Sequence, residues 1–163
     1  MKLYIMRKTT FHSGDDICVG NEDGKQKYDL KSSVLLNLRK IRIVDGNKKE
    51  VAVIKQEFKS LMPKYAIYVD GEKIMTLTKK LQLFFEYVVG ETDRWTIQCG
   101  TMIHNYEILK DGRVVARVSD KSMRWGDSFE IDILDEAEET MAVAIAVAAE
   151  YGIEAKSCLT QPI

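Results

Sequence analysis

The sequence predicts a mainly β protein: a twelve-stranded antiparallel closed barrel around a central hydrophobic C-terminal α-helix, about Glu136–Tyr151. Two observations carry this prediction. Most of the 163-residue chain alternates apolar and polar residues over short segments separated by Gly, Asn and Asp, which is typical of antiparallel strands. The exception is Met141–Ala149, nine consecutive apolar residues. A helix that is apolar all round has to be buried on every side.

Twelve segments fit the pattern of strands. In chain order they are Lys2–Arg7, Asp15–Gly20, Lys25–Leu30, Leu38–Val44, Glu50–Glu57, Lys64–Val69, Lys73–Lys79, Gln82–Val88, Arg94–Cys99, Asn105–Lys110, Arg113–Ser119 and Ser128–Ile133. A closed barrel of twelve strands is too wide for its own side chains to fill, since about eight strands already give an interior just filled by them. We therefore expect the apolar helix on the barrel axis.

The turn sequences support hairpin connections. Asp70-Gly71 and Asp111-Gly112 are two-residue links that favour type I′ turns, and Asp45–Asn47 and Asn21–Gly24 are longer versions. Two predicted hairpins also resemble each other. They are KYAIYVDGEKIMTLTKK and NYEILKDGRVVARVSDK, which share Tyr, Ile and Asp-Gly at positions 41 residues apart. A single offset is weak evidence of repetition, but it suits an up-and-down barrel.

The ends of the expected helix carry recognisable signals. Asp135 is a good N-cap, and Glu138 three residues later completes the pattern of a capping box. The glutamates of the first turn, with Glu139 among them, place negative charge at the positive end of the helix dipole. Gly152 is suited to end the helix. A membrane-spanning helix is the alternative, but it needs roughly 20 apolar residues and the run is much shorter.

Composition sets limits on function. The net charge of −1, from 24 basic and 25 acidic residues, gives no global field toward nucleic acid or lipid, and no nucleic-acid partner is expected. Three cysteines, Cys18, Cys99 and Cys158, follow no metal or redox spacing, which favours a reducing compartment. The N-terminus has no apolar run of signal-peptide length. We expect a single domain over residues 1–163, located in the cytoplasm or peripherally at a membrane.

No catalytic motif is found in the sequence. The two histidines, His12 and His104, lie far apart and in no metal or nucleophile motif. We therefore expect no catalytic residue, no metal ligand and no cofactor, and a protein that is not an enzyme. Trp95 and Trp125 are suited to stacking on a ligand, but an aromatic residue in a barrel strand or turn more often packs in the core.

Seven basic residues are expected to meet at one end of four successive strands, because antiparallel hairpins bring the end of one strand beside the start of the next. They are Arg39, Lys40, Lys55, Lys59, Lys64, Lys79 and Lys80. Only Glu57 opposes this basic rim. Such a cluster suits an anionic head group, with Leu61 and Met62 as a small apolar wedge. The alternative is that these lysines keep strand ends soluble and prevent edge pairing.

With strands and helix placed, the chain resembles the LURP-one-related family. The matching stretches are IRIVDGNKKEVAVIKQEFKSLMPKYAIYVDGE from Ile41, WTIQCG from Trp95 and WGDSFEIDI from Trp125, followed by the apolar helix. The resemblance implies the fold of the tubby C-terminal domain, a twelve-stranded barrel around a C-terminal helix. Tubby-like domains are phosphoinositide-binding modules that tether proteins to membranes. No residue-level lipid motif carries over, so lipid binding rests on fold-level analogy.

The hypothesis drawn from the sequence is a non-enzymatic binding or membrane-tethering module whose basic rim takes anionic phospholipid head groups or a membrane surface. The alternative from another class is a protein-interaction or regulatory scaffold with a protein partner at the barrel rim. A third interpretation is a small-molecule carrier with a pocket between barrel and helix. The oligomeric state has no signature in the sequence.

Overall fold

The computed structural model describes residues 1–7, 17–36, 38–57, 64–82, 85–90, 94–99, 105–122 and 128–152. The strands are β1 (Lys2–Arg7), β2 (Ile17–Asn21), β3 (Gln26–Leu35), β4 (Leu38–Asp45), β5 (Glu50–Gln56), β6 (Lys64–Val69), β7 (Glu72–Gln82), β8 (Phe85–Gly90), β9 (Trp95–Cys99), β10 (Tyr106–Lys110), β11 (Arg113–Ser122) and β12 (Ser128–Ile133). The 3₁₀ turn η1 (Glu136–Glu138), the helix α1 (Glu139–Val147) and the π-helical turn η2 (Ala148–Gly152) follow. The predicted strands and helix are thus confirmed.

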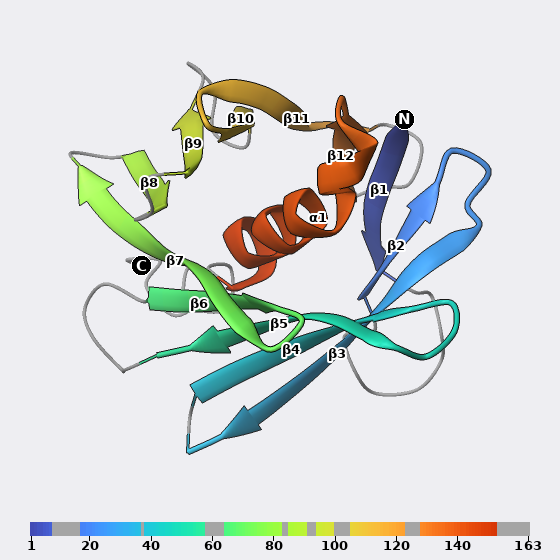
Figure 1. Ribbon diagram of the computed structural model, residues 1–163, viewed down its shortest axis with the longest axis horizontal. Coiled ribbons are helices and arrows are strands. Elements are labelled where there is room, and N and C mark those ends of the chain that lie inside the picture. The colour runs from blue at the N-terminus through green and yellow to red at the C-terminus, as the bar shows by residue number, and fades with distance from the viewer. Residues whose placement is uncertain are drawn as a thin grey trace, which may run out of the picture.

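All twelve strands belong to one antiparallel sheet in the order β8-β7-β6-β5-β4-β3-β2-β1-β12-β11-β10-β9. The sheet curls around α1, and β1, the first strand of the chain, pairs with β12, the last (Figure 1). The prediction of a closed barrel needs a correction: the barrel is nearly closed, because no ladder joins β8 to β9 within the described residues. These two edge strands have six and five residues, which leaves few backbone groups for a further ladder.

The helix forms the centre of the hydrophobic core. Seven consecutive residues, Ala142–Ala148, are completely buried. Inward-facing strand residues such as Ile43, Ile54 and Ile67 pack in the same cluster. The small alanine side chains allow the surrounding strands to approach closely, and the apolar run therefore lies on the barrel axis as predicted. Within the described residues, no helix combines the length and the apolar character needed to cross a membrane.

At the start of the helix, Asp135 is the N-cap as predicted, but Glu138 does not complete a capping box. The Asp135 carboxylate accepts a hydrogen bond from the backbone N–H of Ala137 at 3.2 Å. The expected return bond from Glu138 is absent, because the Asp135 N–H already donates to the carbonyl of Val115 at 3.2 Å. The Glu138 carboxylate instead accepts a hydrogen bond from Lys110.

The two hairpins that resemble each other in sequence also share an irregularity. Both Asp-Gly links have positive φ at both residues, 49° and 81° at Asp70-Gly71 and 50° and 77° at Asp111-Gly112, which is the type I′ pattern. The register shifts between Ile67 and Tyr68 in the β6–β7 pair, and at the equivalent place, between Ile108 and Leu109, in the β10–β11 pair. The sequence similarity therefore corresponds to a shared local backbone geometry.

Three strands, β3, β7 and β11, continue at least three residues beyond their predicted ends, and β3 shows the reason. The pattern ended the third strand at Leu30, whereas β3 continues to Leu35 and pairs with β4 as far as Leu38. All residues from Lys31 to Leu36 are exposed. Alternation of apolar and polar residues reports burial on one face, so a hairpin that extends beyond the core shows no alternation even though its backbone ladder continues.

Candidate functional site

Three of the predicted rim lysines come together on the outer face of the sheet. Lys40 of β4 and Lys55 of β5 are register partners, and Lys55 is also paired with Ala66 of β6, two residues from Lys64. Directly opposite side chains have Cβ atoms about 4.5–5.5 Å apart, and diagonal neighbours are about 7–8 Å apart. All three lysines are exposed. Lys55 Nζ lies 4.8 Å from the ring centroid of Tyr68.

The other predicted rim residues are placed differently. Arg39 lies on the opposite face of β4 from Lys40, half-buried, and its backbone N–H donates to Gln56 Oε1 at 3.1 Å. Lys79 and Lys80 follow Thr78, the register partner of Lys64, in the backbone of β7. Their side chains lie outside the described part of the structure. Lys59, Leu61 and Met62 also lie outside the described residues.

Sequence reasoning missed two basic residues on the same outer face. Lys31 of β3 is the register partner of Arg42 of β4, and both side chains are exposed. Lys31 was missed because β3 was expected to end one residue earlier. The alternation of β4 placed Arg42 on the same face as Lys40, two residues away, and was the available signal. Arg42 donates to Glu50 at 2.5 Å.

The remaining lysines on this face have no acidic partner among the described residues. We call them the basic face; they are Lys31, Lys40, Lys55 and Lys64. Glu57, the acidic residue expected to oppose the rim, forms a 2.5 Å salt bridge with Lys73 instead. This salt bridge raises the pKa of Lys73. Among the described residues, the basic face thus presents its four charges to solvent without an ion-pair partner.

A second candidate site is a hollow of about 370 Å³ beside the start of the helix. It lies between the turn of β6–β7 and the strands β9 and β10. Its apolar lining consists of Val69, Ile74, Trp95 and Met141, and its charged lining of Lys73, Arg94, Lys110 and Glu138. Three cations therefore face one carboxylate around an apolar floor.

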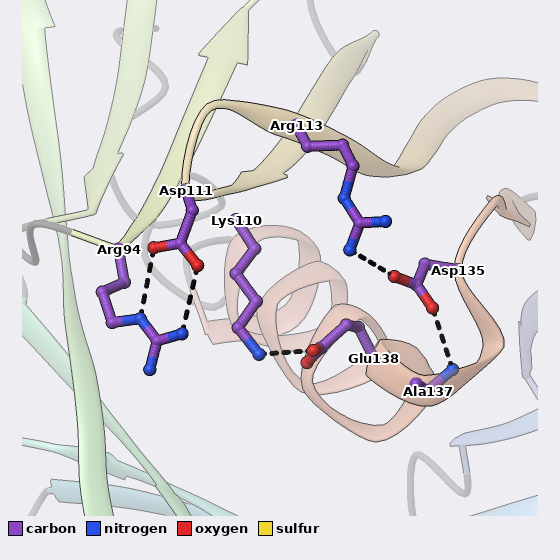
Figure 2. Close-up of polar contacts among 7 residues, drawn as sticks. All are labelled: Arg94, Lys110, Asp111, Arg113, Asp135, Ala137 and Glu138. Atoms are coloured by element: carbon purple, nitrogen blue, oxygen red, sulfur yellow. Dashed lines mark hydrogen bonds and ion pairs between the residues drawn. The ribbon is translucent and has the colours of Figure 1, made fainter.

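Ion pairs hold the charged lining in place (Figure 2). The Arg94 guanidinium forms a bidentate ion pair with the Asp111 carboxylate, in which Nε donates to Oδ1 at 3.2 Å and Nη2 to Oδ2 at 3.1 Å. This hydrogen bonding lowers the pKa of Asp111. Lys110 reaches Glu138 at the start of the helix, and its Nζ lies 5.3 Å from the ring centroid of Trp95. A small anion in the hollow therefore has to compete with existing carboxylates.

The other residues considered in the sequence as site candidates add no further binding site within the described residues. Trp95 is 5 % exposed and belongs to the core cluster, as the packing interpretation predicted, although it also lines the hollow. Cys18 is buried. His12, His104 and Trp125 lie outside the described residues. In the part of the chain that the structure describes, no three His, Cys, Asp or Glu side chains gather as metal ligands.

The architecture defines a class of protein, the mainly β barrels that enclose their own C-terminal helix. Within that class, the chain belongs to the LURP-one-related family, whose sequence profile matches residues 1–150. It is 23 % identical over 143 residues to the uncharacterized protein YxjI of Bacillus subtilis (strain 168), covering 88 % of each chain. An X-ray structure of an Arabidopsis thaliana protein shares the fold, with a TM-score of 0.53 and 13 % identity over 89 % of this chain and 88 % of the other.

Proposed function

We propose that this protein is a non-enzymatic module that binds anionic phospholipid head groups through its basic face. The observation that carries the proposal is the set of four exposed lysines on adjacent strands, none with an acidic partner among the described residues. Like charges directly opposite each other, as at Lys40 and Lys55, destabilise a sheet. An anionic surface would relieve that repulsion, and each lysine near such a surface contributes about 1 kcal/mol.

The proposal includes two finer points from the sequence. One is that the barrel is tubby-like, so that the fold-level analogy with phosphoinositide-binding modules applies. The other is a cytoplasmic protein that attaches peripherally to a membrane. The nearly balanced charge of the chain supports a local rather than a global mechanism, because a net charge of −1 gives no overall attraction to an anionic surface.

Co-sedimentation with lipid vesicles tests this function. Vesicles of phosphatidylcholine alone are compared with vesicles that also contain a phosphoinositide, at low and at physiological salt. Selective binding that weakens as salt rises is expected, because exposed charges are screened. The triple variant K40E/K55E/K64E should lose at least about 100-fold in affinity, the equivalent of three lysines at about 1 kcal/mol each.

A matched control is available at the other end of the same strands. Lys25, Lys48 and Lys49 are exposed lysines of the β2–β3 and β4–β5 turns. K25E/K48E/K49E makes the same change in net charge far from the basic face and should bind as the wild type does. Equal losses in the two triple variants would show that only net charge matters. Wild-type protein that binds neither kind of vesicle would contradict the proposal and favour the protein-interaction scaffold.

A second candidate function, the carrier of a small amphiphilic anion, is favoured by the hollow. Its apolar floor and three cations suit a ligand with an aromatic or aliphatic body and one acidic group, which would replace a carboxylate now paired with one of those cations. The aromatic sulfonate 8-anilinonaphthalene-1-sulfonate is a suitable probe, and saturable binding at one site is expected. I74W, which fills the hollow with a larger side chain, should abolish that site, whereas K40E/K55E/K64E should leave it intact.

A further inference from the structure

The tip of the β3–β4 hairpin exposes an unusual group of apolar side chains. Val34 is 63 % exposed, Leu35 76 % and Leu36 85 %. Elsewhere in the described residues, the large apolar side chains that are exposed are two isolated ones, Met1 and Leu134, at 44 % and 46 %. The hairpin tip therefore concentrates apolar surface in one place. Figure 1 shows this hairpin at the lower left of the molecule, directed away from α1.

The geometry of the turn does not account for these residues. Leu36 has φ of +52°, in the left-handed region that Gly and Asn adopt far more readily than a branched side chain. Asn37 follows directly in the sequence, but at the Leu36 position itself a turn selected only for its backbone would carry Gly or Asn, and one selected for solubility would carry a polar residue. The sequence instead places leucine where it is both exposed and conformationally costly. Contact with a partner outside the chain would explain that choice.

The basic face begins directly behind this tip. Val34 is paired with Arg39, and Ser33 with Lys40, which is itself the partner of Lys55. Leu38, the register partner of the tip residue Leu35, lies two positions before Lys40, a distance of about 7 Å along the strand. One head-group layer of a bilayer is about 5–8 Å deep, which is half the difference between the full thickness of the bilayer and that of its hydrocarbon core. Apolar tip and cations are thus spaced to meet the hydrocarbon boundary and the phosphates together.

We propose that the tip of the β3–β4 hairpin, Val34–Leu36, inserts into the interfacial region of an anionic bilayer while Lys40 and Lys55 lie among the lipid phosphates. This inference rests on the proposed function and assigns its mode of attachment. The complementary charges select a lipid surface over an apolar protein groove. The wedge expected from the sequence, Leu61 and Met62, is not needed for this arrangement.

The test uses the full chain and two kinds of variant. L35S/L36S removes the apolar tip without a change in charge, and L134S is the matched control at an exposed leucine remote from the hairpin. Because all these side chains are exposed, the variants should fold like the wild type, as circular dichroism will check. Binding to vesicles with phosphoinositide should fall at least tenfold in L35S/L36S and stay unchanged in L134S.

Depth is measured independently with L36W and vesicles of brominated lipids. Bromine near the hydrocarbon boundary should quench the added tryptophan of L36W, whereas L134W should add emission that is not quenched. If wild-type protein binds anionic vesicles but L35S/L36S binds equally well, or L36W is not quenched, insertion is wrong and the proposed function stands. Wild-type protein that binds no vesicles contradicts both. Self-association abolished by L35S/L36S would identify a second copy as the occupant and also overturn insertion.

Discussion

The hydroxyl of Tyr28 donates a 2.6 Å hydrogen bond to Glu139 Oε1, and so joins β3 to the first turn of the central helix. Glu139 is only 8 % exposed, and the same oxygen lies 2.6 Å from Lys27 Nζ. A carboxylate that enters a core must be neutralised and hydrogen-bonded to remain there. Two adjacent residues of one strand meet both needs at the point where the helix enters the barrel.

Removal of this hydrogen bond should destabilise the protein. Tyr28→Phe keeps the ring but leaves a buried charged oxygen with one partner fewer, and hydrogen bonds to charged groups contribute about 1.5–3 kcal/mol. We expect a loss in the free energy of unfolding of that size in urea denaturation at pH 7. Tyr68→Phe, at a half-buried tyrosine of β6, is the control and should change stability little. Equal effects of both changes would show that the bond to Glu139 adds nothing.

The same residue makes stability depend on alkaline pH. Burial, together with the hydrogen bond to Glu139, raises the pKa of Tyr28 above its ordinary value of 10.0. A raised pKa in the folded state means that the contribution is present below pH 10 and is lost as pH rises above it. Wild-type protein should therefore lose stability above pH 10 more steeply than Tyr28→Phe. Parallel curves of unfolding free energy against pH would contradict this assignment.

The Asp-Gly turns should tolerate substitution poorly even though space is available. An added Cβ at Gly71 would meet no atom within 4 Å, but φ there is +81°. Ala in this left-handed conformation costs about 1–2 kcal/mol. Gly46 is the matched control, because it has equally open surroundings and no positive φ. Thermal unfolding should show a lower Tm for Gly71→Ala and little change for Gly46→Ala.

The central helix should be sensitive to cavities. Ile145 is completely buried, and Ile→Ala changes in well-packed cores cost about 2–5 kcal/mol. Ile145→Ala should show a loss in that range in chemical denaturation. Leu134→Ala removes a similar volume at a residue that is 46 % exposed and should cost much less. Similar losses at both positions would argue against a helix packed on all sides.

The sequence predicted the fold well because burial controls its pattern. Alternation located every strand, and the absence of a polar face located the helix in the core, since both patterns follow from which side chains avoid water. The prediction failed where a residue's secondary structure or burial does not follow from its polarity. Lys31–Leu35 form a strand beyond the core, and Glu139 looks like a surface charge at a helix start although it is buried.

The candidate site was less predictable for a related reason. Hairpin geometry correctly brought Lys40, Lys55 and Lys64 to adjacent strands, but it grouped residues by strand end and ignored the face on which each lies. Strand alternation would have separated Arg39 from Lys40 and added Arg42. The hollow depends on segments far apart in the chain, such as Trp95 and Met141, and no local pattern reports their approach.

The two similar hairpins allow the ion pair beside the hollow to be measured against an internal control. Asp70 and Asp111 occupy the same position of the same turn type, but only Asp111 pairs with an arginine in the described structure, Arg94. Asn suits this turn position as well as Asp does. Asp70→Asn should therefore leave the free energy of unfolding unchanged or slightly raised. Asp111→Asn should have a lower free energy of unfolding than Asp70→Asn at neutral pH.

The pH dependence of that difference has a definite sign. Hydrogen bonding to Arg94 lowers the pKa of Asp111 from its ordinary value of 3.8. Its contribution is therefore present above about pH 4 and is lost as pH falls through the lowered value. The gap between Asp111→Asn and Asp70→Asn should close below that pH, and also in about 1 M salt, where the Debye length is about 3 Å. A gap that persists in acid would mean that the Asp111 side chain acts through the turn itself and not through its ion pair with Arg94.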